Sequence, residues 1–114
     1  MNDCIFCKIA NKEIPSTVVY EDDKIFAFKD INPVAPVHVL IIPKKHIDGA
    51  DKIKEDDAEL LGYIWAKINH IASLCGVLDD GFRVINNCGE NGGQTVRHLH
   101  FHLIGGVKLD EKLI

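Results

Sequence analysis

The stretch His98-Leu99-His100-Phe101-His102-Leu103-Ile104 alternates histidine with large apolar residues. Successive side chains of a β-strand point to opposite faces of the sheet, so this alternation predicts a strand over about Arg97 to Ile104. Leu99, Phe101 and Leu103 are expected to face the core. The three histidines are expected to line the other face, with about 7 Å between their successive Cα atoms. Packing does not account for three histidines in strict alternation, so we expect them to carry chemistry.

A glycine-rich loop, Asn87 to Thr95, directly precedes this strand. Its three glycines allow backbone N–H groups to approach a phosphate closely, and Gln94 and Thr95 add side-chain donors. Spacing alone leaves two chemical interpretations of the histidines open. Three neutral imidazoles could bind a catalytic zinc ion. Alternatively, one imidazole attacks phosphorus while its neighbours orient it and handle protons, and the adjacent loop favours this second interpretation.

The rest of the chain predicts an α+β fold. Apolar residues recur at three- and four-residue intervals between Glu55 and Cys75, which indicates one long amphipathic helix that ends before Gly76. Cys4 to Ile14 is interpreted as a short N-terminal helix or irregular arm. Four further β-branched or aromatic runs predict strands at Thr17–Tyr20, Lys24–Phe28, Val37–Ile42 and Gly81–Asn86. We therefore expect a five-stranded, mainly antiparallel sheet with the long helix covering one face.

Length and composition restrict the class of protein. A chain of 114 residues accommodates a single domain, residues 1–114, and a domain this small benefits from a bound metal or a partner subunit. The net charge of −4, with no basic run beyond Lys44-Lys45, argues against a nucleic-acid partner. No membrane-spanning stretch and no leader peptide are visible, so we expect a cytoplasmic protein. In a reducing compartment the four cysteines indicate metal binding or reduced thiols rather than disulfides.

The stretch from His98 to Ile104 matches the His-φ-His-φ-His-φ-φ signature of the histidine triad (HIT) superfamily, where φ is an apolar residue. The resemblance continues through most of the chain, over these segments: Phe6-Cys7-Lys8-Ile9, Glu13-Ile14-Pro15, Ala27-Phe28-Lys29-Asp30-Ile31, Ala35-Pro36-Val37-His38, Ile42-Pro43-Lys44-Lys45-His46, Gly92-Gly93-Gln94 and Gly105-Gly106. Together they resemble the branch of small nucleotide-binding proteins that cleave purine nucleoside phosphoramidates. The dinucleoside-polyphosphate branch has Pro-Arg where Gly105-Gly106 stands, which disfavours that branch.

The resemblance implies a homodimer whose two sheets join into one continuous sheet, with a purine nucleoside monophosphate or its phosphoramidate bound to each protomer. It assigns His100 as the nucleophile that attacks the α-phosphorus, with His102 and His38 as supporting catalytic imidazoles that also contact the phosphate. Asp30 corresponds to the residue that accepts hydrogen bonds from the ribose hydroxyls. The remaining nucleotide contacts are assigned to apolar walls around the base (Phe6, Ile9, Phe28 and Ile31) and to phosphate and leaving-group contacts (Asn87, Gly93, Gln94 and Thr95).

Each of these assignments has a structural alternative. The four apolar wall residues could equally belong to the hydrophobic core, and Asp30 precedes Ile31-Asn32-Pro33, where an aspartate commonly forms a turn. The competing class of function is a binding module that senses a nucleotide without cleaving it.

A second cluster is independent of the triad. Cys4 and Cys7 have the Cys-x₂-Cys spacing that places two thiolates on one metal, although one such pair is weak on its own. Some bacterial members of the family, and the related galactose-1-phosphate uridylyltransferases, complete such a site with the first triad histidine. That resemblance assigns His46 and His98 as the other two ligands of a structural zinc ion.

Overall fold

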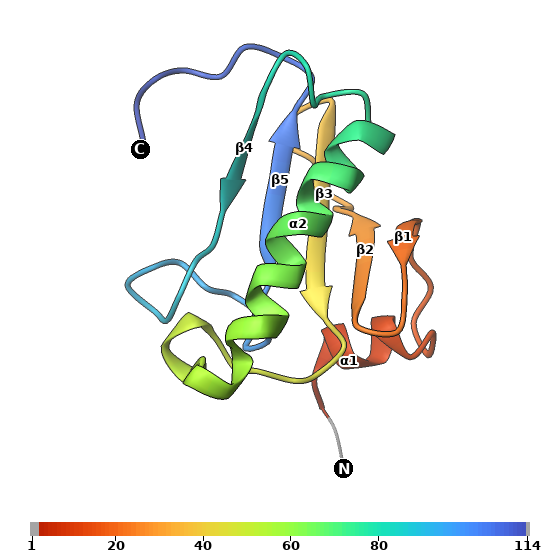
Figure 1. Ribbon diagram of the computed structural model, residues 1–114, viewed down its shortest axis with the longest axis vertical. Helices are drawn as coiled ribbons and strands as arrows, with labels where there is room; N and C mark the ends of the chain where they lie inside the picture. Colours follow the sequence, from red (N-terminus) through yellow and green to blue (C-terminus); the bar gives the residue numbers. More distant parts are fainter. Residues whose placement is uncertain (1–2, 114) are drawn as a thin grey trace.

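The structure is a computed structural model that describes residues 3–113 (Figure 1). Along the chain its elements are helix α1 (Ile5–Ala10), strands β1 (Val18–Glu21), β2 (Ile25–Lys29) and β3 (Val37–Pro43), 3-10 turns η1 (Ala50–Lys52) and η2 (Glu55–Asp57), helix α2 (Ala58–Leu74), and strands β4 (Phe82–Ile85) and β5 (Phe101–Gly105). The strands form one sheet in the order β1-β2-β3-β5-β4, and every neighbouring pair is antiparallel. The predicted α+β class and five-stranded antiparallel sheet are confirmed.

The two faces of the sheet carry separate cores. Helix α2 lies across one face, where Figure 1 shows it in front of β3 and β5, and buries Ile64, Ile68 and Ile71 against it. Side chains alternate along each strand, so Ile25 of β2 faces α2 while its neighbour Phe26 belongs to the core on the opposite face. That opposite core is closed by α1. It is also the face on which the histidines lie.

Strand β5 is shorter than predicted, since the expected strand began near Arg97 and the observed strand begins at Phe101. The pairing of β3 with β5 stops at Ile41 opposite Phe101. Continuing it would bring Pro43 into the ladder, and proline has no N–H to donate. The backbone N–H of Leu99 donates instead to the carbonyl of Ile47, at 2.6 Å.

Side chains alternate between the two faces as predicted, including those that precede the regular strand. Leu99, Phe101 and Leu103 are all buried in the core beneath α2. His98 and His100 therefore occupy an irregular segment that leads into the sheet, and only His102 of the triad lies on the strand itself.

The other element boundaries are close to those expected. The bounds of β1, β2, β3 and β4 each lie within one residue of the prediction. The long helix begins at Ala58 rather than Glu55, because Glu55–Asp57 forms a 3-10 turn in which the Asp57 carboxylate accepts from the Lys54 N–H. It ends before Gly76, whose φ of +75° is the left-handed conformation that favours glycine after a helix. Among residues 3–113, no helix has the length and apolar character needed to cross a membrane.

Candidate metal and triad site

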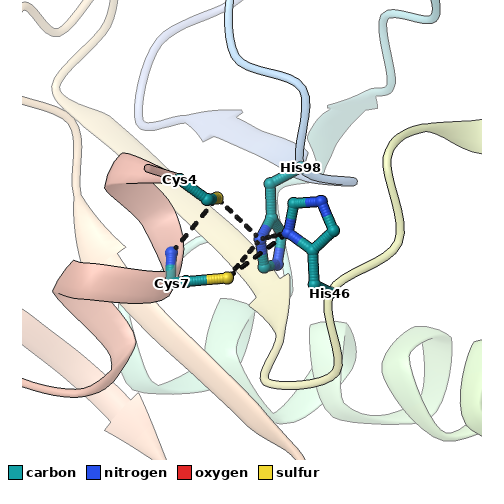
Figure 2. Close-up of side chains that lie close together, drawn as sticks. All are labelled: Cys4, Cys7, His46 and His98. Carbon is teal, nitrogen blue, oxygen red and sulfur yellow. Dashed lines mark hydrogen bonds between the residues drawn. The ribbon is translucent and has the colours of Figure 1, made fainter. Parts of the chain in front are cut away.

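Four side chains from three separate segments converge beside α1, as Figure 2 shows. Cys4 caps the N-terminus of α1 and Cys7 lies within it, His46 follows β3, and His98 precedes β5. The Cys4 sulfur is 3.3 Å from Nδ1 of His98, and the Cys7 sulfur is 3.3 Å from Nδ1 of His46. The four ligand atoms all lie within 4.8 Å of one another. The structure thus brings together the four residues assigned to the metal in the sequence.

The hydrogen bonds of the two imidazoles show which ring nitrogen is available to a metal. Nε2 of His98 is 2.8 Å from the carbonyl oxygen of Pro43, and Nε2 of His46 is 2.7 Å from a carboxylate oxygen of Asp48. Both partners are acceptors, so each Nε2 carries the proton and each Nδ1 carries a lone pair. Burial holds the pKa of His98 below its ordinary value, which keeps this ring neutral.

The two Nδ1 atoms face each other at 3.1 Å. Two lone pairs cannot form a hydrogen bond, and a cation between them removes the conflict. Two cysteine sulfurs and two imidazole nitrogens are the donor set of structural zinc sites, and hydrogen-bonded outer partners such as Asp48 orient zinc-bound histidines. This cluster could therefore hold zinc.

His100 is oriented by the backbone of a member of that cluster. Its Nδ1 lies 2.8 Å from the carbonyl oxygen of His98, so Nδ1–H donates and Nε2 keeps its lone pair. The amide of Asn86 donates to the His100 carbonyl at 2.8 Å, and the ring of Phe6 packs edge-on at a centroid distance of 5.0 Å. His100 is therefore a buried imidazole in a fixed orientation, with Nδ1 directed at a backbone carbonyl.

A second pair of imidazoles lies next to it. The Val34 N–H donates to Nδ1 of His38 at 3.1 Å, so Nε2 of His38 carries the proton and donates to Nδ1 of His102 at 3.0 Å. The neutral His102 must then carry its own proton on Nε2. Burial, followed by the neighbouring His100 and His38, lowers the pKa of His102 to about 4, whereas Asp30 acts in the opposite direction. The centroids of the His100 and His102 rings are 5.2 Å apart, so the two imidazoles are direct neighbours.

The three triad histidines do not form one set of ligand atoms. Within the described part of the chain, His98 belongs to the cysteine cluster and His102 to a group with Asp30 and His38. In that second group Nε2 of His38 donates a proton, which is unfavourable for a metal. The geometry therefore offers no support for a catalytic zinc held by all three histidines.

The residues assigned to the base are divided between two environments. Phe6, Ile9 and Phe28 are buried in the core beneath α1, and Phe6 contacts His100. Ile31 is 91% exposed and does not join them. Asp30 has two partners at once: one carboxylate oxygen accepts from the Asn32 N–H at 2.8 Å, and the other lies 3.4 Å from Nε2 of His38.

The glycine-rich loop is held mainly by Gln94. Its side-chain oxygen accepts from the Gly89 N–H and from Arg97, while its NH₂ group donates to the carbonyls of Asp48 and Val96. The amide thus has four protein partners, which assigns it a role in fixing the loop. Asn87 likewise donates to the Gly92 carbonyl at 2.7 Å. Gly93 has a φ of +79°, and Thr95 is exposed.

Sequence reasoning missed the partners that fix these rings. Asp48 and the Pro43 carbonyl orient the two metal-site imidazoles, and the Val34 N–H orients His38. The spacing His46-Ile47-Asp48 was a usable signal, because a carboxylate two residues from a ligand commonly receives its second N–H. A backbone carbonyl or N–H leaves no such signal in the sequence.

Comparisons with known proteins identify the family and the fold. A family model described as the HIT domain matches residues 11–109. Protein HitA of Neisseria gonorrhoeae is 50% identical over 105 residues, which cover 92% of this chain and 97% of that protein. A 14 kDa zinc-binding protein of Zea mays is 51% identical over 108 residues, which cover 93% of this chain and 84% of that protein. The solved structure of a HIT family hydrolase from Clostridium thermocellum has a TM-score of 0.96 at 50% identity, covering 100% of this chain and 99% of that one.

The matched residues include the whole sheet, helix α2 and the three alternating histidines. The chain belongs to the HIT family.

Proposed function

We propose that this protein hydrolyses purine nucleoside phosphoramidates or related nucleoside phosphate adducts, with His100 as the nucleophile. The observation that carries the proposal is the hydrogen bond from Nδ1 of His100 to the His98 carbonyl, which leaves the Nε2 lone pair for attack. Membership of a family whose solved relatives include proteins named hydrolases supports the same class of reaction.

The proposed reaction has two steps. Nε2 of His100 forms a bond to the α-phosphorus while the P–N bond to the leaving amine breaks. The amine takes a proton from Nε2 of His102, which His38 holds in place, and the attacking water returns a proton to His102 in the second step. Water then attacks the phosphorus of the nucleotidyl-histidine, the P–Nε2 bond breaks, and the nucleoside monophosphate leaves. In this scheme the Asp30 carboxylate accepts from the ribose hydroxyls, and the glycine-rich loop binds the phosphate.

Turnover of an adenosine phosphoramidate tests the proposal. His100→Ala should lower turnover by several orders of magnitude while adenosine monophosphate affinity changes far less. Residual activity within about tenfold of the wild type, equivalent to about 1.4 kcal/mol in the barrier, would eliminate His100 as the nucleophile. An inactive wild type that still binds the monophosphate would favour the non-catalytic binding module instead.

We also propose that Cys4, Cys7, His46 and His98 hold a structural zinc ion. The convergence of four ligand atoms supports this assignment, and so does the name of the maize relative, a 14 kDa zinc-binding protein. Zinc bound there would join the N-terminal arm, through Cys4 and Cys7, to the segment that carries the triad, through His98. Thiolate ligands require a reducing compartment, in keeping with the cytoplasm.

A homodimer completes the proposal. Within residues 3–113, strand β4 is an edge of the sheet and pairs with β5 alone, so its outer N–H and C=O groups can pair with a second copy. Trp65 on α2 is 51% exposed, an apolar surface suited to burial at an interface. Sedimentation of the wild type as a monomer would contradict this part of the proposal.

A further inference from the structure

The metal cluster has an inner and an outer half. Cys7 and His98 are buried, whereas Cys4 is half-buried and His46 is exposed. A groove of about 440 Å³ opens at the outer half, and Cys4 and His46 form part of its wall. The groove therefore gives small solutes access to Cys4, while Cys7 stays covered by protein.

This exposure matters because a metal-binding cysteine is a thiolate, and the thiolate is the form that oxidants attack. Cys7 supplies a second sulfur within 4.8 Å that can resolve an oxidised Cys4. Cys75 is in a different situation, because burial raises the pKa of its thiol. The chain thus contains one cysteine pair with the exposure and spacing of an oxidation-sensitive site.

We propose that Cys4 is a site of oxidation by hydroperoxides, and that its reaction with Cys7 closes a disulfide and releases the metal. The inference rests on the proposed zinc site. The Cys4 thiolate attacks one peroxide oxygen, so an S–O bond forms, the O–O bond breaks, and the other oxygen leaves as water after taking a proton. The Cys7 thiolate then attacks the Cys4 sulfenic acid, the S–S bond forms, and the S–O oxygen leaves as a second water. Two thiolates, one hydrogen peroxide and two protons thereby give one disulfide and two waters.

Loss of the two sulfur ligands affects the triad by two routes. The Nδ1 atoms of His46 and His98 are left facing each other at 3.1 Å with no cation between them, so we expect the two rings to move apart. A shift of His98 carries with it the carbonyl that orients His100. On the other side, Asp48 connects His46 to Gln94, and Gln94 holds the glycine-rich loop. Oxidation should therefore lower turnover as well as zinc content.

The test exposes zinc-loaded protein to hydrogen peroxide. It follows released zinc with a colorimetric metal indicator, disulfide formation by mass spectrometry, and turnover of an adenosine phosphoramidate. The tryptic peptide that ends at Lys8 contains both Cys4 and Cys7, so an internal disulfide makes it lighter by two hydrogens. We expect one zinc released per disulfide and turnover lower by about tenfold or more, the usual effect of disturbing the support of a site. Dithiothreitol with added zinc should reverse all three changes.

Two variants and a measurement of zinc content before oxidation serve as controls. Cys75→Ala should respond like the wild type, and Cys4→Ser should form no disulfide in this peptide. Zinc that stays bound while Cys4 and Cys7 remain reduced would overturn the proposal, and so would disulfide formation with unchanged turnover. The zinc content before peroxide is added separates the two claims, because a metal-free wild type contradicts the zinc assignment rather than the oxidation chemistry.

Discussion

Asp48→Asn tests whether the hydrogen-bonded partner of His46 supports metal binding. The Asp48 carboxylate accepts from Nε2–H of His46 at 2.7 Å, which fixes the ring with its Nδ1 lone pair toward the cluster. Asparagine keeps an oxygen in this position and removes the charge, and the Asp48 backbone carbonyl can still accept from Gln94. The substitution therefore isolates the charge.

The expected magnitude follows from the exposure of the pair. Outer partners of metal ligands change affinity by about 10–100-fold. Because 38% of the His46 side chain and 51% of the Asp48 side chain are exposed, we expect the lower end of that range. A tenfold loss of zinc affinity equals about 1.4 kcal/mol, or about 5 °C in melting temperature at a fixed zinc concentration above the Kd.

Competition with a chromophoric chelator measures the zinc affinity, and thermal melting gives an independent value. Asp51→Asn is the matched control: its side chain is also 51% exposed and lies three residues further along, in η1, but its carboxylate contacts Arg97 and Cys88 rather than a candidate ligand. Equal zinc affinities for wild type and Asp48→Asn, or an equal loss in Asp51→Asn, would refute the reasoning.

Three further predictions concern the metal, the ribose contact and pH. Cys4→Ser should purify without zinc and with a lower melting temperature while His100→Ala keeps the metal; elemental analysis showing the reverse would support a triad-bound zinc. Asp30→Asn should weaken adenosine monophosphate binding by about 1–2 kcal/mol. Removing the 2′ and 3′ hydroxyls of the ligand should weaken its binding to the wild type, but should cause little further loss in the variant. If calorimetry shows that removing the hydroxyls costs both proteins the same affinity, Asp30 is only a turn residue. Because burial lowers the folded pKa of His102 from 6.5 to about 4, the unfolded chain takes up the proton first, and stability is lost as pH falls from 6.5 toward 4. Allowing for solvent screening, we expect the free energy of unfolding to fall by about 1–2 kcal/mol over this pH range, as measured by denaturant-induced unfolding. His102→Gln should not show this fall.

Most of the fold was accessible to sequence reasoning because each element has a local cause. The β2 run is bounded by polar residues, and the α2 run has a helical period with glycine after its end. The predicted start of β5 was wrong because the true start depends on a residue far away in the sequence. Pro43 of the neighbouring strand β3 cannot extend the hydrogen-bond ladder between β3 and β5. The histidine alternation nevertheless predicted the faces correctly, since Leu99 packs beneath α2 outside any regular strand.

The site was predictable at the level of residue types and less so at the level of contacts. Motif spacing indicated Cys4 and Cys7, and the family resemblance assigned His46 and His98; the structure brings the four residues together. No spacing rule indicates that the His98 carbonyl orients His100. Nor does any rule indicate that both ends of the Gln94 side-chain amide form hydrogen bonds within the protein. Ile31 differs from the other residues assigned to the base. The family resemblance assigned it a base contact, but it could not indicate that the side chain is 91% exposed.

The nucleophilic role of His100 is tested most directly by trapping the covalent intermediate. Wild-type protein mixed with an adenosine phosphoramidate and quenched in the first turnover should show adenylate attached to the peptide containing His100, and His100→Ala should show none. The peptide also contains His98 and His102, so fragmentation must place the adduct. An adduct on another histidine, or product release from an active wild type that never carries adenylate, would contradict the account.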